Sequence, residues 1–271
     1  MSASLILAAG AIAALVPLGV VARESVDVAT ATPRFWIALV VAAAGSMGGA
    51  VLQQFDGWQT GLGPALSLAI ATTVAVFAVV AAFDRSARRL APMLTVYLVA
   101  LGVLAVVWQQ APGRPLRSAV FPAWLLIHIA VALVAYGLLT VAAVASGGVV
   151  LQERALRRKR PTNFTRRLPA IADGERIQTR LLVAVEILLG VTLATGVVVN
   201  RAEGLGWLPI DHKTVLSILA FVVIAGLLLL HSRFGLSGRR GARYGLIAYL
   251  LVTLAYPGVK FVTDVLMARG G

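Results

Sequence analysis

The sequence predicts an all-α polytopic membrane protein, and three observations carry this prediction. The 271-residue chain has a mean hydropathy of +0.90, and 59% of its residues are hydrophobic. Only 13% are charged, about half the share usual in a soluble domain. The apolar residues gather in segments of about 20 residues, the length that a helix needs to cross a bilayer. These segments lack the alternation of strands, which favours helices.

Eight segments have this character, and we expect eight transmembrane helices with no sizeable soluble domain. We treat residues 1–271 as one transmembrane domain, with a variable four-helix N-terminal half (1–118) and a four-helix core (119–271) that includes a basic connection (152–180). No basic residue precedes the first segment, so we expect a retained span rather than a cleaved signal peptide. The eight segments are residues 4–22, 35–54, 64–83, 91–110, 123–150, 181–199, 213–231 and 244–266.

The lysines and arginines of the connections predict the orientation. The connections after the odd-numbered segments hold 18 of these cations, and those after the even-numbered segments hold 4. The positive-inside rule therefore places the odd connections in the cytoplasm and both termini outside (N-out/C-out), as in a multi-pass protein of the bacterial cytoplasmic (inner) membrane. The net charge of +13 follows from these loops, and we expect no nucleic acid partner.

The three histidines lie at the ends of apolar segments. His128 lies about one turn into the fifth segment, His212 at the start of the seventh and His231 at its end. His212 and His231 are about 28 Å apart along a helix and cannot bind one iron. His128 and His212 share the outer depth, so they could bind one metal or heme iron if spans five and seven are neighbours. The alternative for each is an interfacial histidine that hydrogen-bonds a carbonyl or a lipid headgroup.

A heme site would also need an apolar slot and cations for the propionates. Lys260 is such a cation, and it follows Pro257, which can kink the eighth span. The alternative for Lys260 is a pair with Asp264, one turn further on. The outer side offers the cations Arg201, Lys213 and Lys260, and the aromatic residues Trp124, Trp207 and Tyr256.

Other polar and small residues give weaker signals. Gly45 and Gly49 form a G-x-x-x-G motif, which we interpret as a packing signal. Glu186 is an intramembrane acid that we expect to pair with Arg180 or a neighbour. Residues 151–160 should extend the fifth helix into the cytoplasm as far as Pro161. Its arginine-rich end is a topology anchor or a surface for anionic lipid or a cytoplasmic partner.

Several function classes are excluded by missing residues. The chain has no cysteine, which removes thiolate metal sites and covalent c-type heme attachment. It also lacks a P-loop, an H-E-x-x-H motif and a pair of carboxylates at useful depth. We therefore expect no enzyme, and no hydrolase or ATPase in particular.

Four motifs in the second half resemble one family. The stretch from Trp124 to His128 (WLLIH), with Ala135 and Tyr136 after it, resembles the span that opens the core of the cytochrome c assembly protein family. Three later stretches are similar to its HemX/YpjD branch. They are DHKTVLS (211–217), HSRFGLSGRR (231–240) and AYPGVKFV (255–262). The resemblance covers about residues 120–266, and the first four spans match only as apolar helices.

The resemblance implies heme handling at the membrane. In the CcsA members, a histidine at the position of His128 is an external heme ligand, and one at the position of His231 lies on the heme route within the membrane. Two features depart from CcsA. The outer loop 201–211 has one tryptophan, Trp207, where CcsA and CcmC have a tryptophan-rich segment. The second external histidine of CcsA is replaced around Lys260, so the complete cytochrome c synthase apparatus is absent.

Together these signals predict a membrane protein related to cytochrome c biogenesis that binds or passes non-covalent, b-type heme. His128 and His212 are the expected metal ligands on the outer side, and His231, Lys260 and Trp124 are further heme contacts. The expected partners are heme, the lipid bilayer, and a membrane or cytoplasmic protein. One alternative is a non-catalytic regulatory or assembly subunit, as in HemX-like control of heme biosynthesis. A small-molecule transporter, suggested by Pro257, is another.

Overall fold

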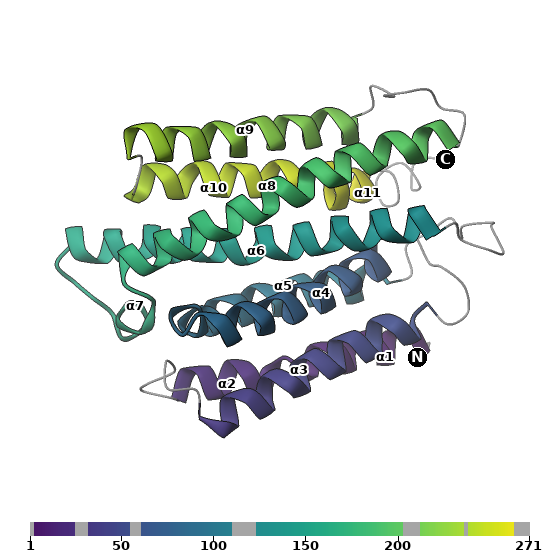
Figure 1. Cartoon of the computed structure of the whole chain (residues 1–271). Helices are drawn as coiled ribbons and strands as arrows, with labels where there is room; N and C mark the ends of the chain where they lie inside the picture. The colour runs from purple at the N-terminus through teal and green to yellow at the C-terminus, as the bar shows by residue number, and fades with distance from the viewer. Residues whose placement is uncertain are drawn as a thin grey trace.

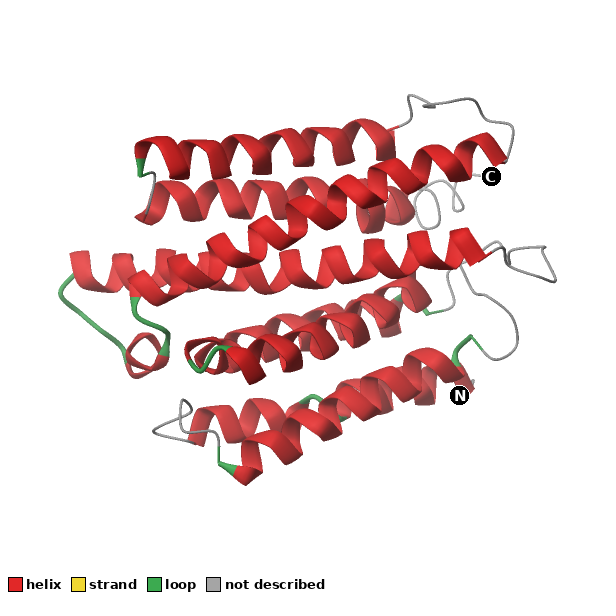
Figure 2. Ribbon diagram, in the orientation of Figure 1, coloured by secondary structure: helices red, strands yellow, loops and turns green. Residues whose placement is uncertain are grey.

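The computed structural model describes residues 3–24, 32–54, 61–109, 123–202, 212–235 and 238–262. These residues form helices joined by short turns, and no strand occurs among them (Figure 2). Eight stretches of helix are long and apolar enough to cross a membrane. The prediction of an all-α bundle with eight membrane-spanning helices is therefore confirmed.

The helices lie side by side, with the N-terminal spans at one edge of the bundle and the last two spans at the other (Figure 1). The first span is divided between two short helices, and the last ends in a π-helix and a short α-helix. The helices are α1 (Ala3–Ala13), α2 (Val16–Glu24), α3 (Pro33–Leu52), α4 (Leu62–Phe83), the 3-10 helix η2 (Ser86–Leu90), α5 (Ala91–Val107), α6 (Ala123–Arg157), α7 (Asn163–Arg167), α8 (Ile171–Ala202), α9 (His212–Phe234), α10 (Gly238–Thr253), the π-helix η3 (Leu254–Gly258) and α11 (Val259–Phe261).

The N-terminal group, α1 to α5, packs through small residues. A Cβ atom built on Gly45 would overlap the Cβ of Ala14, and one on Gly49 would lie 3.0 Å from the Cβ of Ala11. The G-x-x-x-G motif of α3 therefore lets the first span approach closely, as such motifs do in membranes. The first span breaks where Pro17 would place its ring against the carbonyl of Ala13, the last residue of α1.

The C-terminal group contains the four long helices α6, α8, α9 and α10. Helix α8 packs on both α6 and α9, and α10 packs on the same two helices. The main contacts of α6 and α9 are therefore with α8 and α10 and not with each other. Spans five and seven, α6 and α9, lie across the group from one another. His128 and His212 are therefore on helices that do not pack directly against each other.

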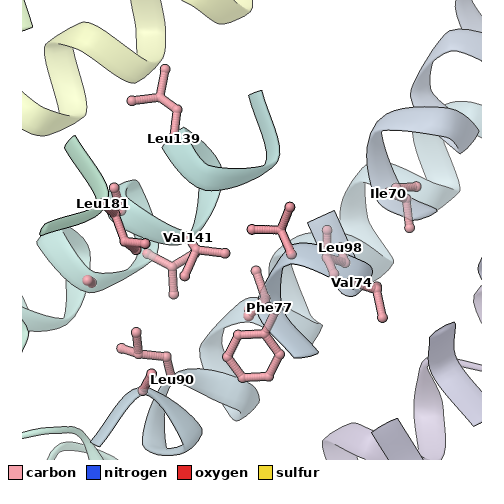
Figure 3. Packing of buried hydrophobic residues seen from close by; sticks show 14 of the residues in the cluster. Ile70, Val74, Phe77, Leu90, Leu98, Leu139, Val141 and Leu181 are labelled. Carbon is pink, nitrogen blue, oxygen red and sulfur yellow. The ribbon is translucent and has the colours of Figure 1, made fainter. Parts of the chain in front are cut away.

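The two groups meet where α4 packs on α6. A Cβ on Gly137 of α6 would lie 3.2 Å from Val76 and 3.4 Å from the carbonyl oxygen of Thr72, so glycine permits this close approach. One buried apolar cluster continues through both groups. Figure 3 shows part of it, with Phe77 of α4 between Leu98 of α5 and Val141 of α6.

The connection after α6 differs from the predicted hydrophilic stretch. Helix α6 ends at Arg157, three residues before the expected limit, and α8 begins at Ile171, ten residues before the expected start of the sixth span. The early start follows from packing, since a Cβ on Gly174 would lie 2.8 Å from the side chain of Val149 in α6. Residues 171–180 are thus held as helix by the neighbouring helix, despite their charges.

Figure 1 separates the two ends of the bundle. The start of α1 and the helix α11 lie at one end, which we call the terminal end. The opposite end, which we call the arginine-rich end, carries η2, α7 and the turn between α9 and α10. Because the number of candidate spans is even, the first span starts and the last span ends at the same end of the bundle. That the arginine-rich end faces the cytoplasm stays a prediction of the positive-inside rule.

Candidate functional site

His128 projects from the first turns of α6 towards α8, near the terminal end of the bundle. Its Nδ1 lies 2.9 Å from the hydroxyl oxygen of Thr195 in α8. The next residue of α8 is Gly196, where a Cβ would lie 3.5 Å from the Cε1 of His128. A half-buried imidazole therefore lies between two helices, in polar contact with Thr195 and with the backbone of Thr192, and the absence of a side chain at Gly196 leaves room for it.

The contacts of the Thr195 hydroxyl favour one tautomer of His128. The hydroxyl oxygen lies 2.8 Å from the carbonyl oxygen of Val191 and 3.1 Å from that of Thr192, both in its own helix. When the hydroxyl donates to either carbonyl, it accepts a hydrogen bond from the Nδ1 of His128. In that tautomer the Nε2 atom has a free lone pair. Binding of a metal by one ring nitrogen, with the other donating to a fixed acceptor, is the usual arrangement of histidine ligands.

Other side chains near the terminal end would suit an aromatic or anionic ligand in part. Trp124 lies one turn nearer the terminal end on the same face of α6, and it is partly exposed. Lys260 of α11 has its Nζ 5.7 Å from the ring centroid of Tyr256. The ring of Phe261 packs edge-on against Trp108 of α5, at a centroid distance of 5.3 Å. These contacts gather aromatic side chains and one lysine at the terminal end.

His212 is the first residue of α9, at the same end of the bundle as His128 (Figure 1). Its side chain lies outside the described residues, as do the side chain of Lys213 and the whole of Trp207 and Asp264. The joint ligation by His128 and His212, and the pairing of Lys260 with Asp264, therefore stay predictions. Arg201, in the last turn of α8, is exposed at this end.

His231 belongs to a different site at the arginine-rich end. It lies in the last turn of α9 and lines a hollow of about 300 Å³, which includes open solvent. The other lining residues come from α8, α9 and α10, and they include Glu175, Gln178 and Thr179. The full length of the bundle separates this hollow from His128 (Figure 1), so the two histidines cannot serve one metal ion.

Two carboxylates hold the start of α10 beside this hollow. Glu175 of α8 accepts a hydrogen bond of 2.6 Å from the backbone N–H of Gly238, and Glu153 of α6 accepts one of 2.9 Å from that of Arg239. The amide of Gln178 donates to the carbonyl of Gly241 at 3.0 Å. The first N–H groups of a helix have no partner within it, and negative charge is favoured there. The start of α10 is thus held by side chains of both α6 and α8.

Three tyrosines form a polar cluster in the interior that the sequence analysis did not identify. The hydroxyl of Tyr249 in α10 is hydrogen-bonded to that of Tyr97 in α5, and it lies 3.2 Å from that of Tyr136 in α6. The cluster joins the N-terminal and C-terminal groups. Its members are about 40 to 150 residues apart in sequence. The sequence indicates the cluster only through the presence of a tyrosine in each of three apolar spans.

Glu186 does not show the expected partner. Its Oε2 is buried and has no hydrogen-bond partner among the described residues, and Arg180 is exposed. The ion pairs described on α8 are instead those of Arg176, at 3.1 Å from Asp173 and 3.8 Å from Asp84. Among the residues of the six described ranges, no three His, Asp or Glu side chains gather closely enough to hold a metal ion.

Comparison with known proteins extends the resemblance. A family model described as Cytochrome C assembly protein matches residues 38–267. The match begins within α3, so the expectation that the first four spans match only as apolar helices was too narrow. A curated relative from Azospirillum brasilense, described as "Uncharacterized 28.8 kDa protein in nifR3-like 5'region", is 47% identical over 272 residues, which is 98% of this chain and 100% of the relative. No solved structure matches the chain.

Proposed function

Because the chain belongs to the cytochrome c assembly protein family, we propose that it serves cytochrome c biogenesis by binding heme at the terminal end of the bundle, with His128 as an iron ligand. Family membership supports heme handling at a membrane, and the proteins of this family are generally non-catalytic components. The specific site, its ligands and its side of the membrane are the content of the proposal.

The observation that carries the proposal is the hydrogen bond between His128 and Thr195. It supports an oriented imidazole, and with the proton on Nδ1 the Nε2 atom would be free to bind iron. The donor set therefore fits a heme, whose iron accepts axial ligands from histidine nitrogens. Because the chain has no cysteine, such a heme would be b-type and held without covalent attachment.

The remaining predicted residues have supporting roles in this proposal. His212 begins α9 at the same end and would be the second axial ligand, reached across the bundle because α6 and α9 do not pack directly on each other. Trp124 would contact the macrocycle, while Lys260 and Arg201 would face the propionates. His231 would contact heme separately, at the arginine-rich end. The positive-inside rule places the His128 site on the outer side of a bacterial cytoplasmic membrane.

The proposal is tested by heme titration of the purified full-length protein in detergent. We expect the wild type to develop a Soret band with the spectrum of a histidine-ligated heme. His128→Ala should lose this band or shift it, and His212→Ala should change the ligation state. His231→Ala should remove only heme that binds at the arginine-rich end, because His231 lies at the far end of the bundle, and it should leave the contribution of the His128 site unchanged. Acidified acetone should extract the heme completely if no covalent bond is present.

Two results would contradict the proposal. One is a wild-type protein that takes up no heme, which would leave the regulatory or assembly subunit as the better interpretation. The other is a His128→Ala variant with the affinity and spectrum of the wild type. Circular dichroism of each variant would show that the helical content is unchanged, so that a lost band reports on ligation.

A further inference from the structure

The segment between α6 and α8, residues 151–170, folds back on the bundle in a defined way, and we call it the fold-back segment. Helix α6 continues seven residues beyond the apolar segment 123–150, a rise of about 10 Å. Lys159 then takes a positive φ of 51°, which reverses the chain. The short helix α7 follows, and Thr162 caps it through a capping box with Thr165.

Buried contacts hold the fold-back segment against the helices. Thr165, Leu168 and Pro169 are buried. The amide of Gln152 donates to the carbonyl oxygens of Leu168 at 3.2 Å and Pro169 at 3.0 Å, so the two ends of the segment are tied to each other. Since its backbone is fixed in this way, the charged side chains extend from a preorganised turn rather than from a flexible loop.

The charge of the fold-back segment is of one sign. Residues 154–172 contain seven arginines and lysines and no acidic residue. The nearest acids in the sequence have other partners, since Glu153 and Glu175 accept hydrogen bonds from the N-terminus of α10 and Asp173 pairs with Arg176. Six of the seven are exposed, and none of the seven forms an ion pair within the part of the chain that the structure describes. They are Arg154, Arg157, Arg158, Lys159, Arg160, Arg166 and the partly exposed Arg167.

Exposed apolar side chains lie beside these cations. Leu156 of α6 and Phe164 of α7 are 59% and 41% exposed. Similar pairs occur where other helices end at this side of the bundle, since Phe83 lies two residues before Arg85 and Phe234 directly follows Arg233. Phe83 and Phe234 are 90% and 79% exposed. Aromatic and cationic residues together at helix ends are typical of the level of lipid headgroups.

We propose that the fold-back segment is a binding site for the headgroups of anionic phospholipids. Figure 1 places α7 beside the ends of the transmembrane helices and not far beyond them, where headgroups are within reach of its arginines. Preorganised arginines favour phosphate, because the guanidinium group donates several hydrogen bonds in a fixed geometry. Leu156 and Phe164 favour a lipid over an acidic protein surface, since each can enter the adjoining acyl region. This site is independent of heme binding.

The test compares lipid retention by native mass spectrometry of the full-length protein. Mixed micelles would contain phosphatidylglycerol and phosphatidylcholine in equal amounts. We expect the wild type to retain phosphatidylglycerol preferentially, and the triple variant Arg157→Gln, Arg158→Gln, Arg160→Gln to lose this preference by roughly tenfold or more. The matched control replaces the same three arginines by lysine, which keeps the charge and should keep most of the preference.

The absence of cysteine allows a check of topology. A single cysteine introduced into the segment would report on which side of the membrane it lies in each variant, without background from other thiols. If the triple variant inverts, the single variants Arg157→Gln, Arg158→Gln and Arg160→Gln replace it, and each should lower the preference by a smaller factor. Equal phosphatidylglycerol retention in the wild type and the glutamine variants would overturn the proposal. So would retention of an acidic protein by the segment with no preference between the two lipids.

Discussion

The two halves of the bundle use their polar side chains differently. In the N-terminal group, the hydroxyls of Ser46, Ser67, Thr72 and Thr73 donate to carbonyl oxygens of their own helices, four residues earlier in each case. In the C-terminal group, polar side chains reach from one helix to another, as His128 does to Thr195, and Glu153 and Glu175 do to the start of α10. Hydroxyls of the C-terminal group, such as those of Thr140 and Ser146, also donate within their own helices. The N-terminal group has cross-links between helices at helix ends, from Gln109 to Gln53 and from Arg88 to Ala81. Among the described residues, directed hydrogen bonds between helices are therefore more numerous in the second half.

This difference indicates in which half the orientation of side chains is most closely determined. Lipid gives helices no hydrophobic reason to associate, so close packing of small residues and interhelical hydrogen bonds must do so. Close packing fixes how near two helices lie, whereas a hydrogen bond also fixes the orientation of a side chain. All three histidines are in the C-terminal group. We therefore interpret the N-terminal group as a scaffold and the C-terminal group as the part that orients the candidate ligands.

The largest effect is expected where carboxylates hold α10. The double variant Glu153→Ala, Glu175→Ala should lose two charge-assisted hydrogen bonds, each worth roughly 1.5–3 kcal/mol. Thermal unfolding in detergent would measure the loss, and hydrogen exchange should show it at the N-terminus of α10. Asp173→Ala is the control, because its pair with Arg176 is about half exposed and should contribute about 0–1 kcal/mol. Equal effects of the two changes would show that these hydrogen bonds contribute no more than an exposed ion pair does.

The next effect concerns the acceptor for His128. Thr195→Val keeps the shape of the side chain but removes the hydroxyl, so heme affinity should fall by roughly 10- to 100-fold, as is common for such supporting residues. Isothermal or absorption titration would measure this change. Thr192→Val is the matched control, since this hydroxyl donates to Leu188 in its own helix. An unchanged affinity for Thr195→Val would mean that the hydrogen bond does not position the imidazole.

In the N-terminal group, the corresponding test is one of volume. Gly45→Ala should lower the free energy of unfolding by about 1 kcal/mol or more, because the new methyl overlaps Ala14. Gly48→Ala, one turn away on the same helix, meets nothing within 4 Å and should cause no loss. Unfolding in detergent would separate the two variants. A stable Gly45→Ala protein would show that α1 and α3 are not held by this close contact.

The smallest effect is expected at the junction of the halves. Tyr249→Phe removes the hydroxyl that bonds those of Tyr97 and Tyr136, and interhelical hydrogen bonds in membranes contribute about 0.6 kcal/mol on average. The same unfolding measurement applies. Tyr244→Phe, at an exposed position of the same helix, should have no effect. A loss several times larger for Tyr249→Phe would show that the junction depends on polar contacts as much as the C-terminal group does.

Composition and segment length were sufficient to predict the eight spans, because a long apolar helix in a membrane needs little from its neighbours. Boundaries that depend on a neighbour were predicted less well. The start of α8 at Ile171 is set by packing on Val149, and residues 171–180 have no apolar signal of their own. The division of the first span had a local cause in Pro17, which the sequence showed but which we did not use.

The candidate site was predictable only in part. Its histidines are visible as rare residues, and the resemblance singled out His128 and His231. Thr195 could not be identified, because it is one of several threonines in apolar spans and its partner lies 67 residues away. The roles of Glu153 and Glu175 were hidden for the same reason. The sequence indicates which groups can bind a ligand, whereas the fold determines which groups orient them.

The central claim is that His128 is an iron ligand, and heme titration of His128→Ala with and without added imidazole tests it most directly. If Nε2 binds the iron, the variant should lose the histidine-type spectrum, and free imidazole should restore it by occupying the space left by the side chain. Thr195 should then accept a hydrogen bond from the added imidazole as it does from His128. A wild-type spectrum in His128→Ala without imidazole would contradict the account.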